Sequence, residues 1–529
     1  MIISEVTFDN RTILLCGYLH NRENNVFTLI VGRNGCGKSV LFKKICQISI
    51  LSILNKRTPY SYDPSENSKW IENGSMTYIF ANTTNRIEIK QDEFNLNQYH
   101  LGDIPENERA AIIETIKQHH LNDFTLERSS DNKLESDNFT HPRIIAVSSS
   151  PFDKFPLADR TTSSHQENQL KSYYYYRGAR TDYRMSKSYL KSKFDQLGAS
   201  FISFFLKHED RKNEILPLFE YLGLSSKFKI ILKDNDHISL DQIIRKENYR
   251  TPIDAVQSSR FFKGIARGDD NLSEEDQNDI IRSAKVLYND ATETNSDRNK
   301  LYTLELDLDP DHESQNSSQS TYLKELSTLV KFDLIDLENI EFNKIATNSR
   351  FLLSEASSGE LCILFNILSI AAEITNNTVI LLDEPELSLH PEWQQDFLPL
   401  LSTIFSHYKQ CHFIIATHSP QIVSSITTSN SYIVNLEDNP TKILEGKEAS
   451  SQSLDYQLAQ VFKAPGNRNE YLISQAVEAL TAIRDGQKPD HSFLTKVNEL
   501  MEFHNIVPDN DPAQKLLSTL QKALSVITK

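Results

Sequence analysis

The chain has 529 residues, 39% of them apolar, so it is long enough for about two to four domains with ordinary hydrophobic cores. Its formal net charge of −16, from 72 acidic against 56 basic residues, argues against a protein whose whole surface attracts nucleic acid. The five cysteines form no C-x-x-C pair and no apolar run could span a bilayer, so we expect a soluble cytoplasmic protein without a disulfide framework, a zinc knuckle or a membrane partner.

The first strong signal along the chain is a phosphate-binding loop at residues 32–39, which match the pattern G-x-x-x-x-G-K-S. An apolar run at residues 26–31 predicts a buried strand before the loop, and an apolar face predicts a helix after it. The glycines let backbone N–H groups surround phosphate oxygens, Lys38 reaches the β- and γ-phosphates, and Ser39 offers a hydroxyl to Mg²⁺. We predict that this loop binds ATP through Gly32, Arg33, Asn34, Gly35, Cys36, Gly37, Lys38, Ser39 and Val40.

Residues 1–160 alternate between strand and helix patterns and form the first predicted lobe. In it, an apolar strand at residues 144–147 runs into a polar loop from Ser148 to Asp153. Residues 161–325 have mainly amphipathic helical patterns, so we predict a helical insertion that closes with an alternating strand at 304–309.

The segment 160–193 of this insertion is locally basic, with eight basic against two acidic residues and six tyrosines among them. Cations beside aromatic rings suit single-stranded nucleic acid, but such tyrosines also pack insertions onto a neighbouring domain while the charges face solvent. Both interpretations stay open. The basic residues are Arg160, Lys171, Arg177, Arg180, Arg184, Lys187, Lys191 and Lys193.

Residues 326–447 form the second predicted lobe, where a buried strand at 379–382 ends in Asp383 and Glu384. We predict that Asp383 holds Mg²⁺ and that Glu384 orients the water that attacks the γ-phosphate. Upstream, Ser357 and Glu360 have the spacing of a helix capping box.

Residues 448–529 are predicted to form a helical C-terminal extension. Asp511 is placed to cap a final helix, and Pro512 suits its first turn. One face of this helix is apolar, which favours either packing inside the extension or docking of a partner. The apolar residues are Ala513, Leu516, Leu517, Leu520, Leu524 and Ile527.

Four motifs together resemble the ABC-type ATPases: the phosphate loop, the segment 357–360 (Ser-Ser-Gly-Glu), the carboxylate pair with the segment 385–391 after it, and the strand and loop at 412–420. The resemblance implies a mixed α/β head with flanking helices, in which 357–360 is the signature motif, 385–391 the D-loop and His418 the γ-phosphate switch. It also implies a head-to-head dimer, in which Ser357, Ser358 and Gly359 of one copy contact the nucleotide of the other. The glutamine that usually ends a first-lobe strand is missing, and the loop from Ser148 to Asp153 is either its replacement or a simple turn.

Within this family, local phrases at 150–155, 357–360 and 387–391 are most similar to the ATPases of Septu-type and retron-associated anti-phage systems, often called PtuA. That resemblance implies a separate HNH-type nuclease as partner and, in a retron, a reverse transcriptase with its RNA-linked single-stranded DNA. A transporter ATPase would not need the insertion, and the long coiled coil of chromosome-maintenance ATPases is absent from the sequence. The nuclease carboxylates of the overlong-defect family also have no convincing match after Val423.

The first functional hypothesis is therefore an ATP hydrolase that regulates a separate nuclease, with Lys38, Glu384 and His418 as catalytic residues. Two alternatives remain: a scaffold that is locked by ATP and turns over little of it, and a DNA-repair ATPase that acts on DNA ends.

Overall fold

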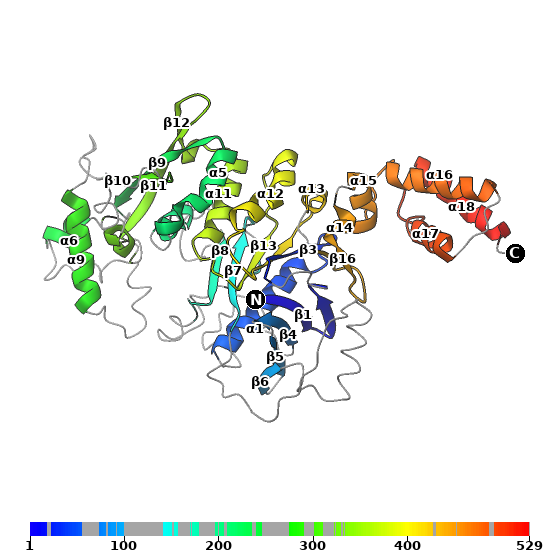
Figure 1. Ribbon diagram of the computed structural model, residues 1–529, viewed down its shortest axis with the longest axis horizontal. Helices are drawn as coiled ribbons and strands as arrows, with labels where there is room; N and C mark the ends of the chain where they lie inside the picture. Colours follow the sequence, from blue (N-terminus) through cyan, green and yellow to red (C-terminus); the bar gives the residue numbers. More distant parts are fainter. Residues whose placement is uncertain are drawn as a thin grey trace.

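The computed structural model describes residues 1–17, 23–54, 74–80, 83–90, 93–99, 141–150, 153–156, 170, 172–178, 196–198, 200–205, 209–234, 240–245, 274–289, 301–309, 322, 324–329, 332, 334–426, 430–450, 452–485 and 491–527. Figure 1 shows a large α/β head from which the last three helices project to one side.

A seven-stranded sheet forms the centre of the head. Its strands are β3 (Val26–Val31), β7 (Arg143–Ser148), β8 (Tyr174–Gly178), β13 (Thr378–Asp383), β14 (His412–Ala416), β15 (Ser431–Asn435) and β16 (Ile443–Glu445). Their order in the sheet is β16-β15-β3-β14-β13-β7-β8, and all neighbours run parallel except β15 and β16. The carboxyl ends of β3, β14, β13 and β7 therefore meet at one edge, where parallel α/β sheets bind their ligands.

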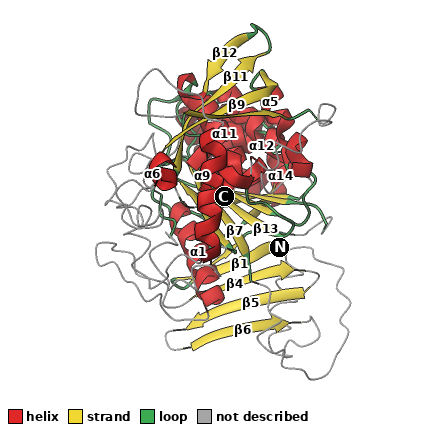
Figure 2. Ribbon diagram, turned by 90° about the vertical axis from the view of Figure 1, so that its left-hand side faces the viewer, coloured by secondary structure: helices red, strands yellow, loops and turns green. Residues whose placement is uncertain are grey.

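Two antiparallel sheets flank the central sheet at opposite ends of the head (Figure 2). The first contains β1 (Ile2–Phe8), β2 (Arg11–Leu14), β4 (Gly74–Phe80), β5 (Thr83–Lys90) and β6 (Glu93–Tyr99). The second contains β9 (Leu224–Asp234), β10 (Leu301–Asp307), β11 (Ile335–Lys344) and β12 (Ser349–Leu352).

Helices cover both faces of the central sheet. Among the described residues, the helices of the head include α1 (Lys38–Leu54), α5 (Leu216–Tyr221), α6 (Leu240–Arg245), α9 (Glu274–Asn289), α11 (Ser358–Ala371), α12 (Pro391–Ile404), α13 (Pro420–Ser424), α14 (Gly446–Ala449) and α15 (Leu454–Tyr456). A π-helix spans Gln457–Val461, and 3-10 turns span Glu209–Ile215 and Leu353–Glu355.

The central strands are apolar along their whole length because both faces of the sheet are covered. In β13, Ile380 and Leu382 belong to the core that includes α11 and α12, whereas Val379 and Leu381 belong to the core that includes α1 and β1. The predicted fold class, a mixed α/β sheet with flanking helices around a phosphate loop, is confirmed.

The segment 161–325 differs from the helical insertion that we predicted. It contains the helices α5, α6 and α9, but β8 extends the central sheet, and β9 pairs with β10 on one side and with β11 of the second lobe on the other. In β9, Phe228, Ile230 and Leu232 are buried. The alternate positions carry lysines that pair with acidic residues on β10 and β11, namely Lys227, Lys229 and Lys233. This two-residue alternation is the pattern of a strand with one buried face.

The described elements that follow β16 are helical. Helices α16 (Glu470–Arg484), α17 (His491–Met501) and α18 (Pro512–Ile527) have a hydrophobic core of their own, in which Ala513, Leu517 and Leu520 are buried. These three residues of the final apolar face therefore pack inside the extension. Within the part of the chain that the structure describes, we find no helix with the length and apolar character that a membrane crossing requires.

His412, at the start of β14, is buried and links three parts of the head. Its Nδ1 accepts a hydrogen bond from the backbone N–H of Ile3 at 3.1 Å, and its Nε2 lies 2.8 Å from the Thr28 hydroxyl. That hydroxyl donates to the carbonyl of Leu15, so it is free to accept from an Nε2–H. Burial, together with the nearby amino-terminal ammonium, lowers the pKa of His412 to about 3.

We expect this histidine to make the head less stable in mild acid. Because its pKa is lower in the folded than in the unfolded chain, its contribution is complete above pH 6.5 and is lost as the pH falls towards 3. The loss amounts to roughly 2 kcal/mol of unfolding free energy between pH 7 and pH 5. Urea unfolding at both values should show that His412→Gln reduces this difference, whereas a matched change at the exposed His407 leaves it in place.

Candidate functional site

The phosphate loop forms the turn between β3 and α1. Gly35 and Gly37 have φ angles of +83° and +107°, which favour glycine, and a Cβ atom on either would meet nothing within 4 Å. Their backbone therefore borders open space at the N-terminus of α1, where a phosphate group gains from loop N–H groups and from the positive end of the helix.

The side chain of Lys38 crosses the inside of the phosphate loop, and only 5% of the residue is exposed. Its Nζ donates to the carbonyl of Gly32 at 2.9 Å and lies 3.5 Å from Nδ1 of His418. Burial lowers the pKa of the Lys38 ammonium, against the raising effect of Cys36 and the nearby carboxylates. The ammonium is thus held at the loop by uncharged groups, a carbonyl and a ring nitrogen, which the anionic oxygens of a phosphate would replace.

Asp383 ends β13 directly beside the loop, and its Oδ1 accepts a hydrogen bond from the Ser39 hydroxyl at 3.4 Å. Burial raises the pKa of Asp383 to about 7, with the Ser39 hydroxyl opposing the rise and the neighbouring carboxylates adding to it. Hydroxyl and carboxylate oxygens are ligands that Mg²⁺ prefers, and a divalent cation here would offset the crowding of negative charge. The pair therefore fits the predicted magnesium site.

Glu384 and His418 lie together at the same edge of the sheet. Glu384 has a φ angle of +52°, and its backbone N–H donates to the carbonyl of Ala416 at 2.9 Å. This bond turns the chain so that Glu384 Oε1 lies 3.7 Å from His418 Nε2. Burial lowers the pKa of His418, and the positive charge of Lys38 lowers it further. The structure thus brings the three predicted catalytic residues together.

Glu386 is part of this site, although the sequence had indicated no role for it. Its Oε1 accepts a hydrogen bond from the backbone N–H of His418 at 2.5 Å. The residue as a whole is partly exposed, but its carboxylate end is buried. Burial raises the pKa of Glu386, while its hydrogen bond with His418 lowers it. The available signal was a second glutamate two residues after Glu384, beyond Pro385.

The polar loop after β7 lies beside Asp383, because Ser148 is its register partner in the sheet. Ser149 Oγ lies 3.4 Å from Cys362 Sγ of α11, and the buried Asp153 accepts a 2.6 Å hydrogen bond from Tyr176. Pro151 and Phe152 lie outside the described residues. The described ends of this loop are therefore tied to α11 and β8, and their role as a replacement for the missing glutamine stays a prediction.

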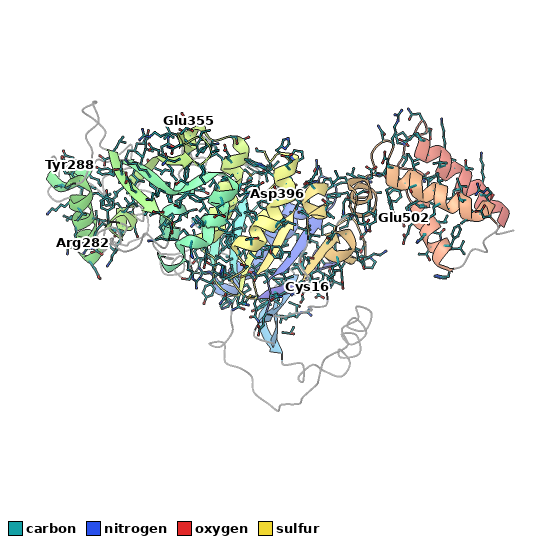
Figure 3. All side chains as sticks on the ribbon, turned by 45° about the horizontal axis from the view of Figure 1, so that its top comes forward. Cys16, Arg282, Tyr288, Glu355, Asp396 and Glu502 are labelled. Carbon is teal, nitrogen blue, oxygen red and sulfur yellow. The ribbon has the colours of Figure 1, made fainter. Side chains whose placement is uncertain are left out.

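The signature segment starts α11 on the outside of the head. Ser357 caps the helix by accepting from the backbone N–H of Glu360 at 3.2 Å, as the capping box predicts. Ser357 and Ser358 are exposed, and Glu355 just before them lies on the outer surface in Figure 3. None of the hydrogen bonds found among the described residues joins either serine to the phosphate loop of the same chain.

Gly359 is buried against the D-loop segment. A Cβ atom at this position would lie 3.1 Å from the ring of Trp393 and 3.2 Å from the carbonyl oxygen of Ser388. Only a residue without a side chain fits here without a shift of its neighbours, so the signature segment and the D-loop are packed directly on each other.

Part of the basic segment 160–193 has a structural role. Tyr174 is buried in β8, Tyr176 bonds to Asp153, and Arg177 forms a 2.8 Å ion pair with the buried Glu373. These residues hold β8 in the sheet, as the packing interpretation predicts. Arg160, Lys171, Arg180, Arg184, Lys187, Lys191 and Lys193 lie outside the described residues.

Arg33 connects the phosphate loop to the segment that leads into the C-terminal helices. Its backbone N–H donates to Glu437 Oε1 at 2.6 Å, and its guanidinium donates to the carbonyl of Lys463 at 3.2 Å. Lys463 in turn lies 3.8 Å from Glu502, which Figure 3 places where the helical extension meets the head. Arg33 therefore links the phosphate loop to Glu437 and to the backbone of Lys463.

Comparison with known proteins adds independent information. A family described as "AAA domain, putative AbiEii toxin, Type IV TA system" matches residues 222–424, which is less than half of the chain but includes the signature segment, the carboxylate pair and His418. The chain is 28% identical over 213 residues to the "Retron Ec83 probable ATPase" of Escherichia coli, covering 37% of this chain and 34% of that protein. It is 22% identical over 290 residues to the "Retron Vc95 probable ATPase" of Vibrio cholerae serotype O1 biovar El Tor, covering 49% of this chain and 54% of that protein. The matched regions thus span only about a third to a half of these relatives.

Among solved structures, the chain is similar to the SMC head domain from Thermotoga maritima, with 13% identity and a TM-score of 0.31, covering 84% of this chain and 99% of that one. It is also similar to an Smc head bound to the C-winged helix domain of ScpA, with 12% identity and a TM-score of 0.30, covering 84% of this chain and 97% of that one.

Proposed function

We propose that the chain is an ATP hydrolase that works as a dimer and regulates a separate nuclease. The observation that carries the proposal is the convergence of Lys38, the Ser39–Asp383 pair and the Glu384–His418 pair at one edge of the sheet. These groups come from the ends of two strands, β13 and β14, and from the N-terminus of α1, and each suits one task in phosphoryl transfer.

In this proposal the phosphate loop binds the triphosphate through its N–H groups, and Lys38 contacts the β- and γ-phosphates. Ser39 and Asp383 hold Mg²⁺, which when bound neutralises charge on the phosphate oxygens. Glu384 orients the attacking water, and the largely neutral His418 donates or accepts a hydrogen bond at the γ-phosphate.

A second copy of the chain completes the site. Ser357 and Ser358 are exposed at the N-terminus of α11, a helix of 14 residues, and they make no hydrogen bond with their own phosphate loop among the described residues. The positive end of this helix suits the γ-phosphate of nucleotide held by another copy. Gly359 lets the segment pack on the D-loop, which adjoins Glu384.

The retron relatives support a role together with a retron, and the proposal extends this role to anti-phage defence of the retron or Septu type. The partners in this proposal are an HNH-type nuclease and, in a retron, a reverse transcriptase with RNA-linked single-stranded DNA. Nucleic-acid contact through residues 160–193 belongs to the same proposal. Because Arg177 pairs with the buried Glu373, charge reversal at Arg180 and Arg184 is the cleaner test of salt-sensitive nucleic-acid binding.

Steady-state phosphate release tests the proposal. We expect wild type to release phosphate at least about 100 times faster than Glu384→Gln, while both bind ATP with similar affinity. Equal, negligible rates with tight ATP binding would instead support the scaffold that ATP locks. Stimulation by DNA ends, absent with circular DNA, would support the repair ATPase.

Purification from the host, followed by identification of the proteins and nucleic acid that come with the chain, tests the proposed partners.

A further inference from the structure

Two side chains, Glu386 of the D-loop segment and Gln394 of α12, contact the switch loop that carries His418. Glu386 accepts from the backbone N–H of His418 at 2.5 Å. Gln394 accepts from the Ser419 hydroxyl at 2.6 Å, and its amide donates to the carbonyl of Leu389 at 2.9 Å. The switch loop is thus held at two consecutive residues by groups from the segment 385–394.

The opposite side of the switch loop is fixed to the strand of the phosphate loop. The backbone N–H of Thr417 donates to the carbonyl of Ile30 at 3.1 Å, and the Thr417 hydroxyl accepts from the N–H of Ser419 at 2.9 Å. The backbone around His418 therefore depends on Glu386 and Gln394 from one side and on β3 from the other.

The D-loop segment is itself a tight turn. The N–H of Leu387 donates to the carbonyl of Glu384, the N–H of Leu389 donates to that of Glu386, and Ser388 has a φ angle of +73°. The carbonyl of Ser388 also borders Gly359 of the signature segment. A continuous path of packed groups thus leads from the exposed signature segment to the ring of His418.

The position of the His418 ring matters because it lies 3.5 Å from Lys38 Nζ and 3.7 Å from Glu384 Oε1. A shift of about 1 Å at a reacting group can lower a rate by about 100-fold. A buried carboxylate that accepts a backbone hydrogen bond is also an expensive way to hold a loop, because burial disfavours its charge. The geometry therefore assigns this carboxylate a purpose other than stability.

We infer that Glu386 and Gln394 are positioning residues that set the place of His418 and transmit the position of the D-loop to it. The inference rests on the ATP hydrolysis proposed above and extends it to how the signature face communicates with the switch. Glu386 acts through the amide of His418, and what it must supply is an acceptor oxygen at the right place.

The test compares Glu386→Ala with Glu386→Gln. We expect the alanine variant to lower kcat about 30-fold while the Kd for ATP stays within about threefold of wild type, since the phosphate loop is untouched. The glutamine variant keeps an acceptor oxygen and should regain kcat to within about threefold of wild type. Glu392→Ala, which removes an exposed carboxylate at the start of α12, is the matched control. Wild-type turnover in Glu386→Ala, or equal losses in both Glu386 variants, would overturn the inference.

Hydrogen exchange gives a readout that does not depend on turnover. In Glu386→Ala the amide of His418 should exchange at least about tenfold faster, while amides of the phosphate loop are unchanged. If wild type hydrolyses ATP no faster than Glu384→Gln, the proposed function fails, yet this measurement still decides whether Glu386 holds the switch loop. Gln394→Ala offers a second variant should the alanine change at 386 prevent folding. It should lower kcat about fivefold and speed exchange at Ser419, and unchanged values for both would contradict the inference.

Discussion

Replacing Lys38 by alanine is expected to weaken ATP binding by at least about 100-fold, equivalent to roughly 2.7 kcal/mol. The ammonium lies at the loop with partners at 2.9 Å and 3.5 Å that are neutral, and a triphosphate offers anionic oxygens in their place. Charge-assisted hydrogen bonds of this kind are about twice as strong as neutral ones.

The same change should leave the nucleotide-free head as stable as wild type or more so. Lys38 is buried, so its charge is poorly solvated, and this burial lowers the pKa of its ammonium. Wild type at an ATP concentration of about 100 times Kd should gain about 2.7 kcal/mol of unfolding free energy, and Lys38→Ala should gain almost none.

Isothermal titration and thermal unfolding with and without ATP measure both effects. Lys44→Ala, on the same helix but outside the loop, controls for the loss of a lysine from α1. If ATP stabilises Lys38→Ala as strongly as wild type, the phosphate loop is not the ATP-binding site.

The sequence was sufficient to predict the elements that carry the site. The runs at 26–31, 144–147 and 379–382 are apolar except for Thr28, and in the structure they are β3, β7 and β13, buried on both faces. In such a sheet the residues that follow each strand meet at one edge, so the meeting of Lys38, Asp383 and His418 follows from local patterns and the parallel order.

Other features depend on long-range pairing that local patterns do not encode. The strand β9 alternates lysines with apolar residues, and its partner β11 comes from the second lobe, so a reading of 161–325 alone missed the sheet. The hydrogen bond that the His418 amide donates to Glu386 likewise depends on left-handed backbone at Glu384 and Ser388. Neither glutamate nor serine predicts that conformation from its residue type. The site that we propose between two copies also has no counterpart among the contacts of a single chain.

Arginine in place of Ser358 is expected to abolish ATP hydrolysis, by about 100-fold or more, without unfolding the protein. Ser358 is exposed at the first position of α11, where a substitution changes unfolding free energy by less than about 0.5 kcal/mol. The cap at Ser357 stays intact. Bulk at this position collides with nothing in one chain, but it would keep a second copy from approaching the nucleotide.

This variant also separates a site shared by two copies from one within a single chain. Ser358→Arg should bind ATP with the wild-type Kd, because its phosphate loop is unchanged, yet it should fail to form ATP-dependent dimers in sedimentation experiments with the added Glu384→Gln change. Inactivity together with weakened ATP binding would mean that the serine acts on its own nucleotide.

Mixing two inactive variants gives the sharpest result. A dimer of Lys38→Ala with Ser358→Arg contains one site in which an intact phosphate loop faces an intact signature segment, and one in which both are defective. If the sites act independently, activity should return to about a quarter of the wild-type rate when pairing is random, and towards about half when Ser358→Arg pairs poorly with itself and most dimers are mixed. Lys38→Ala mixed with a chain that carries both changes has no intact phosphate loop and should stay inactive. If the first mixture stays inactive while Ser358→Arg alone is also inactive, the signature segment of one copy does not complete the ATP site of the other.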